Sequence, residues 1–429
     1  MRVLGVWGLA AGIVNITIGG GIFRLPAGVA AQLGTAAPIA YLVCAVAMGL
    51  IVVCFAEAGS RVSLTGGLYA YVEVAFGPLV GFIAGVALWA GSTAATAAVI
   101  SFFADAVSAL VPGIGGGVAR ASLIVVILAG LAALNVRGIR GANRFNMAMT
   151  VAKLLPLLLF VVVGLVALRP ESVRWEGTPA IGQIARASAF LMFAFLGVES
   201  ALVPSGEVRD SARTVPRALF IAMVTVTLIY AAVQLSAQSA LGTGLAASRT
   251  PVADAAGVVL GGWGRTLILA GSAISMFGYV SGMTLAVPRM LYAFGRDGFA
   301  PRSLAAVHDG WRTPHVAIVA QTVLHGVLAL TGTFEKLAII GTGSILLVYA
   351  ACCLATMRLR RMPFTGEGRP FAPRLAWPVP ILALGVLVWL LGSLTAQEAL
   401  ALAAMVAGAG VVYLVTLRLR SPARPGAAT

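Results

Sequence analysis

The feature that most limits how this chain can fold is a series of twelve long apolar stretches joined by short polar connections. Each stretch is long enough to cross a bilayer as a helix, which takes about 20 residues. Only 10% of the chain is charged, which is too little to cover the surface of a water-soluble protein. We therefore predict an all-α, polytopic membrane protein with twelve transmembrane helices, at residues 5–31, 36–58, 78–108, 117–136, 145–168, 184–205, 216–241, 265–292, 314–331, 334–357, 377–396 and 398–417.

The distribution of basic residues predicts how these helices are oriented. Roughly three times as many arginines and lysines lie in connections on the side of the two termini as on the other side, and basic connections favour the cytoplasm. We therefore expect a multi-pass protein of the cytoplasmic (inner) membrane with both termini in the cytoplasm. The net charge of +15 does not indicate a nucleic-acid partner, because the basic residues lie singly between apolar stretches and form no single patch.

The sequence lacks the common motifs of catalysis and metal binding. It has no P-loop, no HExxH helix and no GxSxG turn, and its cysteines form no CxxC pair. The cysteines Cys44, Cys54, Cys352 and Cys353 fall inside apolar stretches, as small core residues do. We expect one membrane domain over residues 1–429 that is not an enzyme, binds no metal or cofactor, and exists in the lipid bilayer as a monomer or homodimer.

Two predicted helices are interrupted at mid-membrane depth. The first contains three consecutive glycines, Gly19, Gly20 and Gly21, followed by a proline, and the sixth contains Gly197 beside Glu199. Glycine runs and proline break helices, and backbone groups released in hydrocarbon persist only against a cavity, an ion or a ligand. The alternative is that these glycines merely allow helices to pack closely. Paired interruptions at matching positions of two repeats favour a transporter binding site.

A broken helix can bind a zwitterion through its own backbone. The N–H groups at the start of its second half favour a carboxylate, and the C=O groups at the end of its first half favour an ammonium group. An α-amino acid carries both groups. The sequence therefore predicts a site for an amino acid between the two interrupted helices.

Several ionisable residues lie within or near the predicted spans, where an unpaired charge is costly. Lys153 should face the interior, where it either bonds permanently to broken-helix carbonyls or takes part in proton coupling. Glu199 is either a proton carrier or an acid that ties the sixth helix to a neighbour. Arg24 is expected to line the outer vestibule, and Asp105 and His325 are expected to have structural hydrogen bonds.

Motifs along nearly the whole chain together resemble the amino acid-polyamine-organocation (APC) superfamily. They lie at residues 19–23, 66–71, 76–78, 153, 193–199, 207–210, 213–218, 289–298 and 312–314. The resemblance implies a LeuT-like fold, with two inverted five-helix repeats at 5–169 and 181–358 and two further helices at 377–417. It also implies secondary active transport of amino acids or related amines by alternating access.

The resemblance further assigns roles to individual residues. The glycine break would hold the substrate carboxylate, and carbonyl groups of both interruptions would hold its ammonium group. The substrate-binding residues implied are Ile16, Thr17, Gly19, Gly20, Gly21, Ile22, Phe193, Ala194, Phe195 and Gly197, with Phe193, Thr96 and Tyr279 as the gate or pocket wall. Lys153 matches the lysine that replaces a sodium ion in sodium-independent members, and Lys153 and Glu199 are the expected coupling residues.

Departures from the family pattern bear on the substrate. Phe193 stands where the arginine/agmatine antiporter has a gating tryptophan, and Thr96 stands where that protein has an asparagine. Both differences, together with Arg24, favour neutral or small amino acids over cationic ones. Sodium-independent proton symport is the leading hypothesis. An exchanger of amino acids or amines, and a transporter-like sensor without net flux, are the alternatives.

Overall fold

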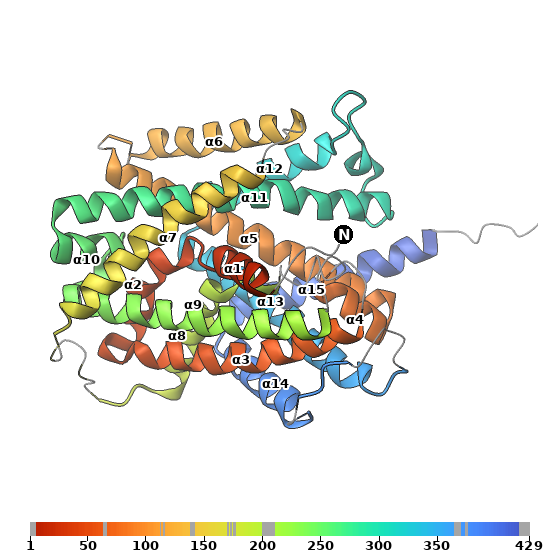
Figure 1. Cartoon of the computed structure of the whole chain (residues 1–429). Helices are drawn as coiled ribbons and strands as arrows, with labels where there is room; N and C mark the ends of the chain where they lie inside the picture. The colour runs from red at the N-terminus through yellow and green to blue at the C-terminus, as the bar shows by residue number, and fades with distance from the viewer. Residues whose placement is uncertain are drawn as a thin grey trace, which may run out of the picture.

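The chain is helical throughout the part that the computed structural model describes (Figure 1). This part is residues 6–419 except 63–66, 112, 115, 138–141, 170, 172–173, 175–176, 200–210, 364–369 and 374–375. At 142–153, 211–212 and 419 only the backbone is described. No β-strand occurs among these residues.

The described residues form fifteen α-helices and several short 3-10 helices. The α-helices are α1 (Val6–Thr17), α2 (Gly21–Leu33), α3 (Pro38–Arg61), α4 (Leu68–Phe76), α5 (Pro78–Leu110), α6 (Gly117–Arg137), α7 (Ala142–Val166), α8 (Ile181–Leu191), α9 (Ser211–Leu241), α10 (Pro251–Leu260), α11 (Gly262–Arg296), α12 (His315–Thr331), α13 (Phe334–Leu359), α14 (Pro378–Leu391) and α15 (Ala396–Leu419). The 3-10 helices include η1 (Gly34–Ala36), η3 (Met192–Phe195), η6 (Gly242–Ala247) and η7 (Arg302–Ala305).

Many of these helices are suited to a bilayer. Within the described part, seven are long and apolar enough to span a membrane alone, namely α3, α5, α6, α9, α11, α13 and α15. The pair α1 and α2 passes the same test as one span bent by 56°, and α8, α12 and α14 are among the shorter apolar helices. The all-helical polytopic membrane protein is thus confirmed, whereas the twelve-span count and the inverted repeats stay predictions.

Helices α5 and α13 form the centre of the bundle and pack against each other. In each of these two helices, 67% of the apolar membrane-length stretch is buried inside the protein, whereas the share is 17% in α6 and 11% in α15. Figure 1 shows α6 and α14 at opposite edges, with α1 and α5 between them. Helix α9 packs against both α1 and α3, which brings the first broken helix against the second half of the chain.

The partly buried Asp105 and the buried His325 each have a nearby polar partner. Asp105 accepts a hydrogen bond from Arg120 Nε at 3.1 Å, and His325 Nε2 lies 3.1 Å from Gln321 Nε2. These contacts fit the structural roles predicted for Asp105 and His325. The four cysteines are buried and unbridged, as expected for core residues.

Candidate functional site

The glycine run interrupts the first span as the sequence predicts. Helix α1 ends at Thr17 and α2 begins at Gly21, with a 56° bend between them. The Gly19 N–H bonds to the Thr17 carbonyl at 2.8 Å, which is not a helical contact. A Cβ atom at Gly20 would lie 2.7 Å from Met276 Cγ, so glycine is needed at this close approach to α11.

The second interruption lies beside the first. Helix α8 ends at Leu191, continues as the 3-10 helix Met192–Phe195, and is followed by Gly197 with φ +104°. That φ is disfavoured for residues with a side chain, and a Cβ atom at Gly197 would also lie 3.0 Å from Ile16 Cγ2. Glycine therefore lets the two broken segments touch. Residues 200–210, with the expected motif at 207–210, lie outside the described part.

A small cavity of about 20 Å³ lies where the two interruptions meet. Its lining is Ile16, Thr17, Gly19, Gly20, Gly21, Ala95, Val99, Phe193, Ala194, Leu196 and Tyr279. This volume is about enough for one water molecule and too small for an amino acid. The structure thus has a closed site, and side chains must move before a larger ligand can enter.

The cavity brings together most of the residues predicted at the substrate site and leaves some aside. Ile22, Phe195 and Gly197 do not line it, and Phe195 instead packs edge-on against Tyr230 at a centroid distance of 5.2 Å. Thr96 also lies outside the lining and donates a hydrogen bond to the Ser92 carbonyl at 2.7 Å.

Helix α5 contributes two residues to the cavity wall that were not predicted. Ala95 and Val99 are four residues apart, so they lie on one face of the helix, and both line the cavity. Thr96 does not line the cavity itself, but its side chain contacts Tyr279, which does. The helical spacing of Ala95 and Val99 within an apolar span was a usable signal for their role.

Tyr230, on α9, connects the two interruptions and was not predicted. Its hydroxyl lies 2.8 Å from the Thr17 carbonyl and 2.9 Å from the Ala194 carbonyl, and the side chain is fully buried. One hydroxyl proton is shared between these two acceptors, each of which keeps a second lone pair for another donor. A single tyrosine in an apolar helix gives no sequence signal for such a role.

Glu199 ties the second interruption to α13. Its carboxylate Oε2 accepts hydrogen bonds from the Gly197 N–H at 2.9 Å and from the Tyr349 hydroxyl at 2.7 Å. Tyr349 in turn packs edge-on against Phe55 of α3. These contacts support the structural alternative given for Glu199, and its role as a proton carrier stays a prediction.

Arg24, in the first turn of α2 just after the glycine run, forms a second connection. Its guanidinium lies 2.9 Å from the Glu335 carboxylate at the start of α13. It also donates to the Arg249 carbonyl at 2.5 Å, in the segment that precedes α10. Lys153 lies in α7, but its side chain is outside the described part, so its expected contacts stay predictions.

Among the described residues, the cavity lining contains no carboxylate, lysine, arginine or histidine. Its polar groups are backbone N–H and C=O groups and the hydroxyls of Thr17 and Tyr279, and the Thr17 Oγ1 is buried without a hydrogen-bond partner among the described residues. Helix α2 begins at Gly21, which lines this space, and the N-terminus of a helix favours a negative group. The arrangement can therefore bind a small ligand through backbone dipoles.

Comparisons with known proteins concern nearly the whole chain. Residues 4–415 match the model of a family described as amino acid permease. The chain is 26% identical to a methylthioribose transporter of Bacillus subtilis (98% of this chain, 94% of that protein). It is 29% identical to a serine/threonine exchanger (89% and 88%) and 28% identical to a branched-chain amino acid permease (87% and 86%), both also from Bacillus subtilis.

Proposed function

The chain belongs to the amino acid permease family, and we propose that it is a secondary transporter that moves amino acids across the cytoplasmic membrane by alternating access. The observation that carries this proposal is the meeting of two interrupted helices at one small cavity. In a membrane, backbone groups at such interruptions need a partner, and a zwitterion supplies both charges.

The closed cavity is consistent with one state of an alternating-access cycle. Two connections join the broken segments to the rest of the bundle, Arg24 with Glu335 and Glu199 with Tyr349. Both join a broken segment to α13. In our proposal, α13 and the broken segments move relative to each other, so that the site opens to one side at a time while the other connection holds.

The lining also supports a preference for neutral, small amino acids. A cationic side chain would need an acid in the cavity wall, and the wall contains none. The cavity of about 20 Å³ leaves little room for a ligand side chain. Even a Cβ atom at Gly20 would lie 2.7 Å from Met276, and one at Gly21 would lie 3.0 Å from Phe193. The relatives include an exchanger for serine and threonine, which fits the same size class.

We propose that the transporter is independent of sodium and coupled to protons, with Lys153 and Glu199 as the coupling residues. The support is the position of Lys153 in α7 and of Glu199 against Tyr349. An exchange mechanism is the second candidate, because one of the relatives is an exchanger. The twelve-span topology, the two repeats and the cytoplasmic termini belong to the same proposal.

Purified protein in proteoliposomes tests these proposals directly. A thermal-shift panel of the standard amino acids, common polyamines and methylthioribose would identify the ligand, and labelled ligand would then be used for uptake. Uptake into empty vesicles that follows an inward proton gradient without sodium supports symport. Uptake only into vesicles preloaded with amino acid or amine supports exchange. Binding without flux under either condition would contradict transport and favour a sensor.

A further inference from the structure

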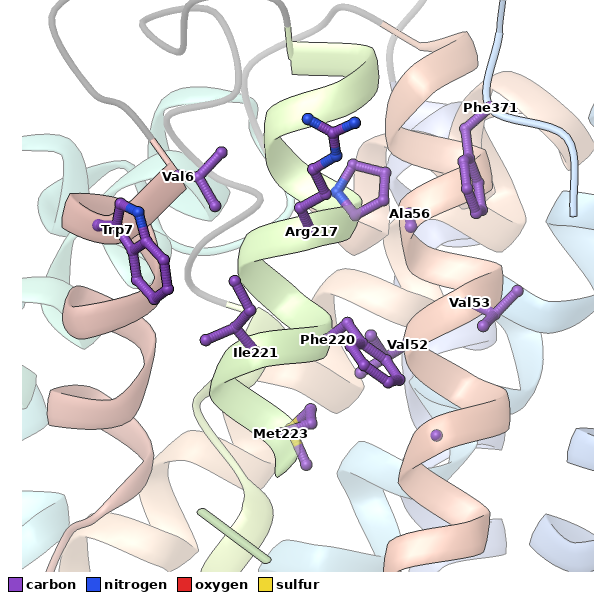
Figure 2. Close-up of a pocket in the computed structure, with 12 residues that line it drawn as sticks. Val6, Trp7, Val52, Val53, Ala56, Arg217, Phe220, Ile221, Met223 and Phe371 are labelled. Atoms are coloured by element: carbon purple, nitrogen blue, oxygen red, sulfur yellow. The ribbon is translucent and has the colours of Figure 1, made fainter. Parts of the chain in front are cut away.

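A second hollow, the α1–α3–α9 groove, lies away from the central cavity between these three helices (Figure 2). Its volume is about 580 Å³, and its lining is apolar apart from one arginine, Arg217. Trp7 on α1 is 76% exposed and Phe220 on α9 is 69% exposed. In a membrane such side chains contact acyl chains, so the groove opens toward the lipid.

Among the described residues, the charge around this groove is positive. Figure 2 shows Arg217 at one end of the groove, with Phe220 and Ile221 further along α9. Arg213 lies one turn before Arg217, on the same face of the helix. Both side chains are exposed, and neither has a hydrogen-bond or ion-pair partner among the described residues.

The acidic residues of the three helices do not neutralise these arginines. Helices α1 and α9 contain no aspartate or glutamate, and α3 contains only Glu57. Glu57 is buried and bound by Arg360 at 2.5 Å, and it also lies 3.5 Å from Arg61. The hydrogen bonds to Glu57 raise the pKa of Arg360, and they engage the Glu57 carboxylate. Within the described part of the chain, no acid on these helices therefore competes with an external anion for Arg213 and Arg217.

The groove lies in the leaflet where anionic lipids are found if the predicted orientation holds. The arginines at the start of α9 are among those that place this end of the helix in the cytoplasm. Basic pockets between membrane helices on that side bind anionic headgroups, and each arginine or lysine near an anionic surface contributes about 1 kcal/mol.

We propose that the α1–α3–α9 groove is a binding site for an anionic phospholipid. The headgroup phosphate accepts hydrogen bonds from Arg217, and an acyl chain lies along Phe220, Ile221 and Val53. The two arginines without acidic partners favour a net negative headgroup over a zwitterionic one. Because Trp7 belongs to the first half of the broken span, a bound lipid touches the segment that precedes the glycine break.

Native mass spectrometry of the full chain tests the charge requirement. Palmitoyl-oleoyl phosphatidylglycerol and phosphatidylcholine would be titrated separately, and bound lipid counted. We expect phosphatidylglycerol to bind more tightly, and Arg217→Gln to weaken its binding about five-fold, since one arginine contact is lost. The control is Arg302→Gln, which removes the same charge from an exposed position in η7 and should leave binding unchanged.

A second variant tests the position of the acyl chain. Gly49 lines the groove, and a Cβ atom added there would meet no atom within 4 Å, so Gly49→Leu is expected to fill the groove without crowding the backbone. We expect Gly49→Leu to displace the tightly bound phosphatidylglycerol, and Gly408→Leu, in equally open space on α15, to retain it.

Three results would overturn the proposal. Equal binding of the two lipids would mean that the groove holds acyl chains without regard to headgroup. Unchanged phosphatidylglycerol binding in both Arg217→Gln and Gly49→Leu would place the lipid elsewhere. A dimer that only Gly49→Leu dissociates would show that a second copy of the chain occupies the groove.

Discussion

Replacing Tyr230 with phenylalanine would test whether the two interrupted helices depend on one shared hydroxyl. In the structure this hydroxyl reaches the Thr17 and Ala194 carbonyls at 2.8 and 2.9 Å. Phenylalanine keeps the ring and its packing against Phe195 but removes the donor. The change is therefore confined to hydrogen bonding at the site.

The expected cost follows from the burial of the two carbonyls. The hydroxyl has one proton, so one hydrogen bond is lost, and a buried acceptor left unsatisfied costs about 1–3 kcal/mol. The free energy of unfolding should fall by that amount. The same carbonyls are proposed to receive the substrate ammonium group, so their loss of alignment should also weaken substrate binding. A loss of about 1 kcal/mol in binding corresponds to about five-fold in Kd.

The assay compares an amino acid with its analogue that lacks the amino group. In the native protein the amino acid should bind more tightly, because only it reaches the two carbonyls. In Tyr230→Phe the advantage of the amino acid should shrink about five-fold, with the analogue unaffected. The control is Tyr41→Phe, which removes a buried hydroxyl that bonds to Gln234 at 3.0 Å and should lower stability without changing this ratio.

An unchanged ratio in Tyr230→Phe, despite normal folding, would refute the reasoning. It would mean that the carbonyls of Thr17 and Ala194 are held in place by the helices themselves, or that the ammonium group binds elsewhere. Equal changes in Tyr230→Phe and Tyr41→Phe would point to a general loss of stability.

Three further predictions can be tested with the same preparation. Gly20→Leu should abolish ligand-dependent thermal stabilisation, because even its Cβ would lie 2.7 Å from Met276; unchanged stabilisation would move the site elsewhere. Arg24→Gln and Glu335→Gln, combined in a double-mutant cycle, should show a coupling of about 0.2–1 kcal/mol in the free energy of unfolding, and additive effects would mean that the ion pair does not hold α2 to α13. Lys153→Ala should abolish proton-driven uptake or lock the carrier, and normal pH-dependent uptake in this variant would remove Lys153 from coupling.

Local sequence was enough to locate the interruption in the first span. Three glycines in a row lack the side chains that favour a helical backbone, and this property does not depend on the rest of the fold. The break between Thr17 and Gly21 follows from it. The second interruption was harder to predict from local sequence, because a single glycine such as Gly197 does not by itself break a helix. Its positive φ is seen only in the structure.

The contacts around the site depended on packing. Arg24 and Glu335 are 311 residues apart, and the pairing of Glu199 with Tyr349 also joins distant segments. No local pattern marks such partners, because they meet only when α13 packs beside the broken segments. For the same reason the places of Ala95 and Val99 in the cavity wall were not predicted.

The sequence by itself determined that this chain is a helical membrane protein with a broken first span, because apolar length and glycine content act through local chemistry and solvent. Only the tertiary structure decided which side chains meet at the break, that Tyr230 joins both interruptions, and that the site is closed to about 20 Å³. Those outcomes depend on helix rotation and on contacts between segments far apart in the chain, which the packing of the whole bundle sets.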